Sequence, residues 1–313
     1  MDIEFLLLLQ HFREATNNVF TPFMEHVSHF SVHYLIIIPV LIYWLLNKEK
    51  GLYILASYSL SCGINDIIKL SACVYRPWIK DPRIVPAGGA VKSATGYSFP
   101  SGHTAIAGSL YGGLAVSFNK RRAVTALCIF AALLTGFSRC YLGVHTPQDV
   151  LAAFAETALA LYIVSKLFAY IKAHPEKENI FLLVSFIIGW LGIIYITFKP
   201  YPTDFSDGKL LVDPQKMMND GYADICLFIA FPVSRFIEKT FIKFEPAGLN
   251  AKGILICMAG IVPLYFMMKY MGDALDLLLG SHFGHFCSMF ILVFYCAALY
   301  PIVIKILCNK KSV

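Results

Sequence analysis

Charged residues are scarce in this sequence: they make up 15% of its 313 residues, while 58% of the chain is hydrophobic. A soluble domain carries roughly 25% charged residues. The deficit argues against a soluble globular protein. Several apolar segments also approach the roughly 20 residues that cross a bilayer as a helix. The composition therefore predicts an integral membrane protein.

Three further absences narrow the class of protein. The nine cysteines form no CxxC pair, so we expect mostly buried free thiols; a disulfide between Cys73 and Cys140 stays open. No basic stretch is interleaved with aromatic residues, so the net charge of +6 does not indicate nucleic-acid binding. Asp2 and Glu4 stand where a cleavable signal peptide would carry basic residues, so we expect no such peptide.

Nine apolar segments are predicted to cross the membrane, which makes the fold class an all-α polytopic membrane bundle. They are residues 33–47, 51–72, 102–118, 123–141, 148–171, 180–198, 221–238, 253–272 and 284–307. One or two amphipathic helices before them are expected to lie at the outer membrane interface, and a further, poorly formed span is the alternative for this segment. The polar loop 199–220 separates a core, residues 1–200, from a three-span extension, residues 201–313.

Lysine and arginine gather in one set of alternate loops and at the C-terminus. Lys48, Arg121, Lys172 and Arg235 belong to this set. Loops rich in lysine and arginine stay in the cytoplasm, so the opposite loops are predicted to face outward, to periplasm, cell exterior or organelle lumen. We expect a bacterial cell membrane protein whose functional site faces outward.

Three polar blocks stand at span ends on this outer side. The first, K-LSACVY-RP, runs from Lys69 to Pro77. Lys69 and Arg76 are about two helical turns apart and can face one side. Arginine offers a planar fork for two phosphate oxygens, and lysine offers a compact charge. Taken alone, the pair is more typical of cations that anchor a span at the interface.

The second block, PSGH, runs from Pro100 to His103 and opens a predicted helix. Ser101 is a natural N-cap, and Gly102 lets a ligand approach the backbone. The N-terminal amides of a helix favour bound phosphate, and His103 in the first turn can protonate a leaving oxygen. For the tetrapeptide alone, a plain capped helix start with an incidental histidine is about equally favoured.

The third block joins Ser138 and Arg139 to His145 and Asp149. A carboxylate four residues after a histidine can orient its ring and stabilise the imidazolium. Thr146 and Asp149 also fit a capping box for the following helix. The two roles of Asp149 can coexist, but capping alone leaves His145 unexplained.

Together the blocks resemble the signature of the type 2 phosphatidic acid phosphatase superfamily: Lys-x6-Arg-Pro, Pro-Ser-Gly-His and Ser-Arg-x5-His-x3-Asp. This chain matches every signature position, and the resemblance covers roughly residues 50–170. The resemblance implies a six-helix membrane core in which His145 attacks phosphorus, Asp149 orients it and His103 protonates the leaving alkoxide. The residues that it implies as phosphate ligands are Lys69, Arg76, Ser101, Gly102 and Arg139.

We therefore expect a membrane phosphatase that acts on a lipid phosphate or isoprenoid pyrophosphate through a phosphohistidine, without metal or other cofactor. A sugar phosphatase stays open, since glucose-6-phosphatase has a similar nine-span, lumen-facing layout. A lipid phosphotransferase also stays open. A transporter with a phosphate site is the alternative from another class; intact His103, His145 and Asp149 argue against it, since binding alone needs no nucleophile.

Overall fold

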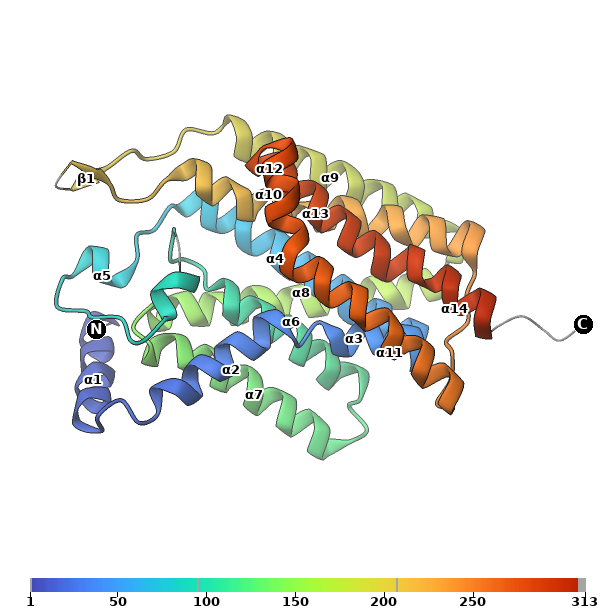
Figure 1. Ribbon diagram of the computed structural model, residues 1–313, viewed down its shortest axis with the longest axis horizontal. Helices are drawn as coiled ribbons and strands as arrows, with labels where there is room; N and C mark the ends of the chain where they lie inside the picture. The colour runs from blue at the N-terminus through green and yellow to red at the C-terminus, as the bar shows by residue number, and fades with distance from the viewer. Residues whose placement is uncertain (1, 95, 207, 309–313) are drawn as a thin grey trace, which may run out of the picture.

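The computed structural model describes residues 2–94, 96–206 and 208–308, and it is a bundle of long helices (Figure 1). The first half contains α1 (Asp2–Ala15), α2 (Thr21–His33), α3 (Ile37–Leu41), the π-helix η1 (Ile42–Leu46), α4 (Lys48–Ala72), α5 (Pro77–Lys80), the 3₁₀-helix η2 (Ala90–Ser93), α6 (Gly102–Ser117), α7 (Arg122–Tyr141) and α8 (Pro147–Ala173). The predicted all-α membrane bundle is confirmed.

The second half begins with the 3₁₀-helix η3 (Pro175–Lys177) and α9 (Glu178–Phe198). Two short strands, β1 (Phe205–Ser206) and β2 (Lys209–Leu210), pair antiparallel in the polar loop after α9. The chain continues through α10 (Pro214–Ile237), the π-helix η4 (Glu238–Ile242), α11 (Ala251–Phe266), the π-helix η5 (Met267–Met271), α12 (Gly272–Leu279), α13 (Ser281–Phe294), the π-helix η6 (Tyr295–Leu299) and α14 (Tyr300–Cys308). Residues 309–313 of the predicted extension lie outside the described residues.

Six helical stretches among the described residues are long and apolar enough to cross a membrane. They are Thr21–Leu46, Arg122–Tyr141, Pro147–Ala173, Pro175–Phe198, Ala251–Leu279 and Ser281–Cys308. Three other predicted spans coincide with α4, α6 and α10, which are outside this set. Helix α6 has only 16 residues, and α4 carries Asp66 and Lys69 within its length.

The N-terminal region differs from the prediction. Residues 21–31 were expected at the membrane interface, but α2 packs against α6 and α7 and continues through α3 and η1 as one apolar stretch. Ser31 Oγ lies 2.9 Å from Thr135 Oγ1 of α7. Small polar side chains of this kind let two helices approach within the bundle, which an amphipathic pattern alone does not reveal.

The three polar blocks meet at one end of the bundle because of where their helices begin and end. Helix α4 stops at Cys73, whose left-handed backbone (φ +48°) turns the chain out of the helix just after Lys69. Helix α7 ends at Tyr141, and α8 begins after Thr146. Figure 1 shows α1, α5 and β1 at this end of the bundle, and α14 at the other.

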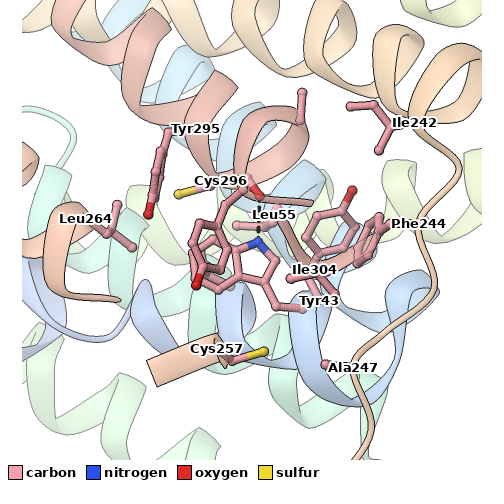
Figure 2. Close-up of a cluster of buried hydrophobic side chains, with 14 of the residues drawn as sticks. Tyr43, Leu55, Ile242, Phe244, Ala247, Cys257, Leu264, Tyr295, Cys296 and Ile304 are labelled. Carbon is pink, nitrogen blue, oxygen red and sulfur yellow. Dashed lines mark hydrogen bonds between the residues drawn. The ribbon is translucent and has the colours of Figure 1, made fainter. Parts of the chain in front are cut away.

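The C-terminal extension packs closely on the rest of the chain. Helix α10 lies against α4, α9 and α13. At the end away from the polar blocks, Tyr43 and Trp44 of η1 are fully buried in one apolar cluster. Figure 2 labels Tyr43, Phe244 and Tyr295 of this cluster. Trp44 Nε1 donates a hydrogen bond to Cys296 O at 2.7 Å. The extension thus contacts both the N-terminal span and the helix that carries Lys69.

Candidate active site

All eight predicted site residues lie at the junction of the ends of α4 and α7 with the starts of α6 and α8. His103 stands in the first turn of α6 and interacts electrostatically with four of the other site residues. These are Arg139, His145, Arg76 and Lys69. The structure therefore brings together residues that are up to 80 positions apart in the sequence.

Arg139 is a buried cation with unused hydrogen-bond donors. Only 1% of the residue is exposed. Its Nη1 donates to Ser28 Oγ of α2 at 2.7 Å, but Nε and Nη2 have no hydrogen-bond partner among the described residues. A guanidinium removed from water is costly unless an anion pairs with it. Arg139 is thus prepared to receive an anion with two parallel donors.

Arg76 touches the predicted nucleophile. It extends from the loop between α4 and α5, and its Nε donates to Gly96 O at 3.1 Å while its Nη1 donates to Val144 O at 3.0 Å. The same Nη1 lies 2.8 Å from His145 Nε2. Burial lowers the pKa of Arg76 to about 10, so the side chain remains a cation at neutral pH.

Lys69 is held by two neighbours on its own helix. Its Nζ donates to Asn65 Oδ1 and to Asp66 Oδ1, both at 2.9 Å. Asp66 and Lys69 form an ion pair about one helical turn apart. Gly102 leaves room for this cation at the start of α6, because a Cβ there would lie only 3.1 Å from Lys69 Nζ. One ammonium hydrogen remains available for a ligand beside the first turn of α6.

Asp149 completes the predicted capping box, and its carboxylate also lies beside His145. Its Oδ2 accepts from the Thr146 amide at 2.8 Å, and the Thr146 hydroxyl accepts from the Asp149 amide at 3.3 Å, which completes a capping box. The same Oδ2 lies 3.4 Å from His145 Nδ1. That contact is longer than a normal hydrogen bond, and catalytic contacts often tighten only when substrate binds.

His145 lies in the loop between α7 and α8 and is almost completely buried. Burial, followed by the Arg76 guanidinium, holds the pKa of His145 well below its ordinary value, although Asp149 acts in the opposite direction. The imidazole is therefore neutral in the unliganded protein. A neutral ring has the lone pair that a nucleophile needs.

Ser101 precedes α6 as predicted, but the structure shows no capping hydrogen bond from its side chain. Its Oγ instead accepts from Thr104 Oγ1 at 2.9 Å, which leaves the Ser101 hydroxyl proton free to donate. The Ser101 amide donates to Asp149 O at 3.1 Å. This contact ties the start of α6 to the first turn of α8.

The loop between α4 and α6, of which residues 77–94 and 96–100 are described, contacts the site through Ser98. It contains the short helices α5 and η2, because Pro77 is compatible with the first turn of a helix. Ala87 N donates to Leu142 O at 2.9 Å, three residues before His145 in the chain. Ala90 and Tyr141 belong to the apolar cluster beneath this contact.

The sequence analysis did not predict three residues that support the site. Ser98 Oγ donates to Asp149 Oδ2 at 2.6 Å, Ser28 supports Arg139, and Asn65 supports Lys69. Asn65 precedes Lys69 by four residues, a helical spacing that could have indicated it. Ser28 and Ser98 act across 111 and 51 positions of sequence, and no local pattern signals such contacts. Cys73 and Cys140 are free thiols.

A buried histidine and aspartate beside three cations, at the end of an apolar helical bundle, define a membrane enzyme that handles phosphate groups. The comparison with known families agrees: a family model described as the PAP2 superfamily matches residues 50–173. This segment contains every signature residue, so the predicted resemblance to this superfamily is confirmed over residues 50–173. The prediction of a phosphoric monoester hydrolase is confirmed by the same match and by the similar proteins described next.

Three curated proteins resemble the chain. Phosphatidylglycerophosphatase B of Bacillus subtilis is 27% identical over 158 residues, which cover 48% of this chain and 73% of that protein. Undecaprenyl-diphosphatase of Sulfolobus acidocaldarius is 24% identical over 153 residues, covering 49% and 71%. Phosphatidylglycerophosphatase B of Haemophilus influenzae is 38% identical over 101 residues, covering 29% and 38%. No solved structure matches the chain significantly.

Proposed function

We propose that this protein hydrolyses a lipid phosphate or an isoprenoid pyrophosphate at the membrane surface. The observation that carries the proposal is Arg139, a buried guanidinium with two unpartnered donors, beside the buried pair of His145 and Asp149. The names of the similar proteins support a lipid-borne phosphate as the substrate. The predicted alternatives, a sugar phosphatase, a phosphotransferase and a transporter, have no observation of their own in their favour.

In the first half of the proposed reaction, the His145 imidazole attacks phosphorus, and the bond between phosphorus and the ester oxygen breaks. His103, as an imidazolium beside the bound phosphate anion, gives its proton to the departing alkoxide and becomes neutral. Asp149 stabilises the positive charge that develops on the phosphorylated ring. The product is a phosphohistidine and a free alcohol, or a shorter phosphate if the substrate is a pyrophosphate.

In the second half, water attacks the phosphohistidine. His103, now neutral, accepts a proton from that water, and the bond between phosphorus and His145 breaks. Inorganic phosphate leaves, and both histidines return to their initial state. Throughout, Lys69, Arg76 and Arg139 balance the charge on the phosphoryl oxygens, with Ser101 and the amides at the start of α6. These cations make the reaction independent of a metal ion in this proposal.

The proposed site faces away from the cytoplasm. The cations of the opposite loops support this orientation, because Lys48, Arg121, Lys172 and Arg235 all stand at or beside the helix ends remote from the site. A bacterial cell membrane is the proposed location. The core 1–200 would carry the chemistry, and the extension 201–313 would be built around it.

The function is tested by phosphate release from purified protein in detergent micelles. The substrate panel contains phosphatidate, phosphatidylglycerophosphate, undecaprenyl pyrophosphate and glucose 6-phosphate. We expect turnover of at least one lipid substrate and loss of at least about 10³-fold with His145→Ala. His174→Ala, at the far end of α8, is the matched histidine control and should retain activity. A folded His145→Ala protein that still hydrolyses the lipid substrate would refute the nucleophile.

A further inference from the structure

Asp66 helps to hold Lys69 in position, and one carboxylate oxygen of Asp66 has no donor that accounts for its burial. Asp66 is 2% exposed, and its Oδ1 accepts from Lys69 Nζ at 2.9 Å. Its Oδ2 is buried and accepts no hydrogen bond from an N–H or hydroxyl group of the described residues. A buried carboxylate oxygen without a donor costs free energy, so the surroundings of Oδ2 need an account.

The neighbour of Asp66 on that side is Asp224. Asp224 belongs to α10 and faces the side of α4 that carries Tyr58, Cys62 and Asp66, three residues spaced by four. Helix α10 packs against α4, and this packing brings the Asp224 carboxyl close enough to that of Asp66 for the two groups to interact. Asp224 is outside residues 50–173, so this contact comes from the C-terminal extension and not from the segment that matches the superfamily.

Two carboxyl groups in such contact cannot both be ionised inside a helical bundle, so one of them keeps a proton. Asp66 is the ionised member, because Lys69 stabilises its charge directly. Asp224 then carries the proton and can donate it to Asp66 Oδ2. This arrangement satisfies the oxygen that otherwise has no donor.

A second acid supports Lys69 from the opposite helix. Glu156 of α8 accepts from Asn65 Nδ2 at 2.5 Å through its Oε1, and this contact turns Asn65 Oδ1 toward Lys69. The two side chains that hold the ammonium group are thus each fixed by an acid from a different helix. One of those helices, α10, belongs to the extension.

We propose that Asp224 is a positioning residue, which donates a hydrogen bond to Asp66 and thereby aims Lys69 at the phosphate. The proposal rests on the proposed function and gives the extension a part in it. Asp224 also lines a cavity of about 330 Å³, together with Ile106 and Met268, so a slightly larger side chain has space at this position.

The test compares Asp224→Asn with Asp224→Leu. Asparagine keeps a donor for Asp66 Oδ2 and has no charge, so it should retain activity and vanadate affinity within about threefold. Leucine removes the donor, and we expect vanadate binding, measured by calorimetry, and kcat/KM to fall roughly 10- to 100-fold, the size of one hydrogen bond to a charged group. Thermal stability should not fall with leucine, because replacing a buried acid by an apolar side chain is often neutral or stabilising.

A double-mutant cycle distinguishes an effect of Asp224 through Lys69 from a general disturbance of the structure by the substitution. If Asp224 acts through Lys69, then Asp224→Leu should add little further loss in a Lys69→Gln background. Ser234→Ala is the control within α10, because this buried serine bonds only to its own helix at Ala230 O and lies away from the site.

Each outcome decides the proposal. Equal losses for asparagine and leucine would mean that the Asp224 charge matters, which overturns a protonated Asp224. Full vanadate affinity in Asp224→Leu, or additive losses with Lys69→Gln, would also overturn it. Failure of the proposed function is a separate result: the wild-type protein would release no phosphate, while calorimetry would still report whether Asp224 supports anion binding at Lys69.

Discussion

Arg76 Nη1 lies 2.8 Å from His145 Nε2, and the guanidinium of arginine can only donate. His145 Nε2 is therefore the acceptor, with its lone pair toward Arg76, and the ring proton is on Nδ1. That nitrogen faces Asp149 Oδ2 at 3.4 Å. The contact assigns the tautomer in which Nε2 would be the nucleophilic atom of the proposed reaction, with the aspartate placed to stabilise the cationic ring. In that reaction a phosphoryl group bonded to Nε2 would replace the hydrogen bond from Arg76.

Substitution should separate the chemical role of Asp149 from its structural role as a helix cap. In Asp149→Asn, the amide oxygen can still accept from Ser98 and Thr146, so α8 should remain capped. The charge that stabilises the imidazolium is lost, and we expect kcat to fall by about 10²–10⁴-fold with little change in thermal stability.

Thr146→Ala is the converse variant. It removes the hydroxyl half of the capping box and should cost about 0.5–2 kcal/mol of stability while most activity remains. Thermal unfolding and phosphate release, measured on the same preparations, check both variants. Similar activity losses in the two would mean that Asp149 acts through the helix cap alone.

His103 should matter most when the leaving group is poor. A general acid assists the departure of an alkoxide and does little for a nitrophenolate, which leaves readily without a proton. We expect His103→Ala to lose about 10²–10⁴-fold in kcat/KM on an alkyl phosphate and much less on an aryl phosphate. His145→Ala should lose both activities alike. Equal losses for His103→Ala on the two substrates would restrict His103 to binding phosphate.

Metal removal should leave the activity intact. Lys69, Arg76 and Arg139 supply the positive charge that a bound cation would otherwise provide. We therefore expect full activity after extensive treatment with EDTA, and inhibition by vanadate, which adopts the five-coordinate geometry of the phosphoryl transition state. Activity that disappears in EDTA and returns only with a divalent ion would contradict this prediction.

The orientation can be measured by cysteine labelling of intact cells in a cysteine-free background. Lys92→Cys and Lys209→Cys place a thiol at exposed positions on the side of the site, and both should react with an impermeant maleimide. Arg121→Cys is exposed at the opposite end, between α6 and α7, and should react only after the membrane is opened. The reverse pattern would place the site in the cytoplasm and change the accessible substrates.

The sequence by itself determined the membrane class and indicated the candidate site residues that the structure brings together. Apolar runs fix the helices, because a backbone in hydrocarbon must bond internally. Pro77, Thr146 and Pro147 set where the helices of the site begin, because proline and the capping hydroxyl act over one turn. These signals are local, so they can be predicted without knowing the neighbours of a helix.

Only the tertiary structure decided how those residues are supported. The placement of α2 inside the bundle depends on its contacts with α6 and α7, and its own amphipathic pattern fits an interfacial helix equally well. The contacts of Ser28 with Arg139 and of Asp224 with Asp66 join helices that are distant in sequence. Which buried group carries a proton, and which cation keeps a donor for its ligand, depends on these neighbours, because charge inside a bundle is stable only where a partner compensates it.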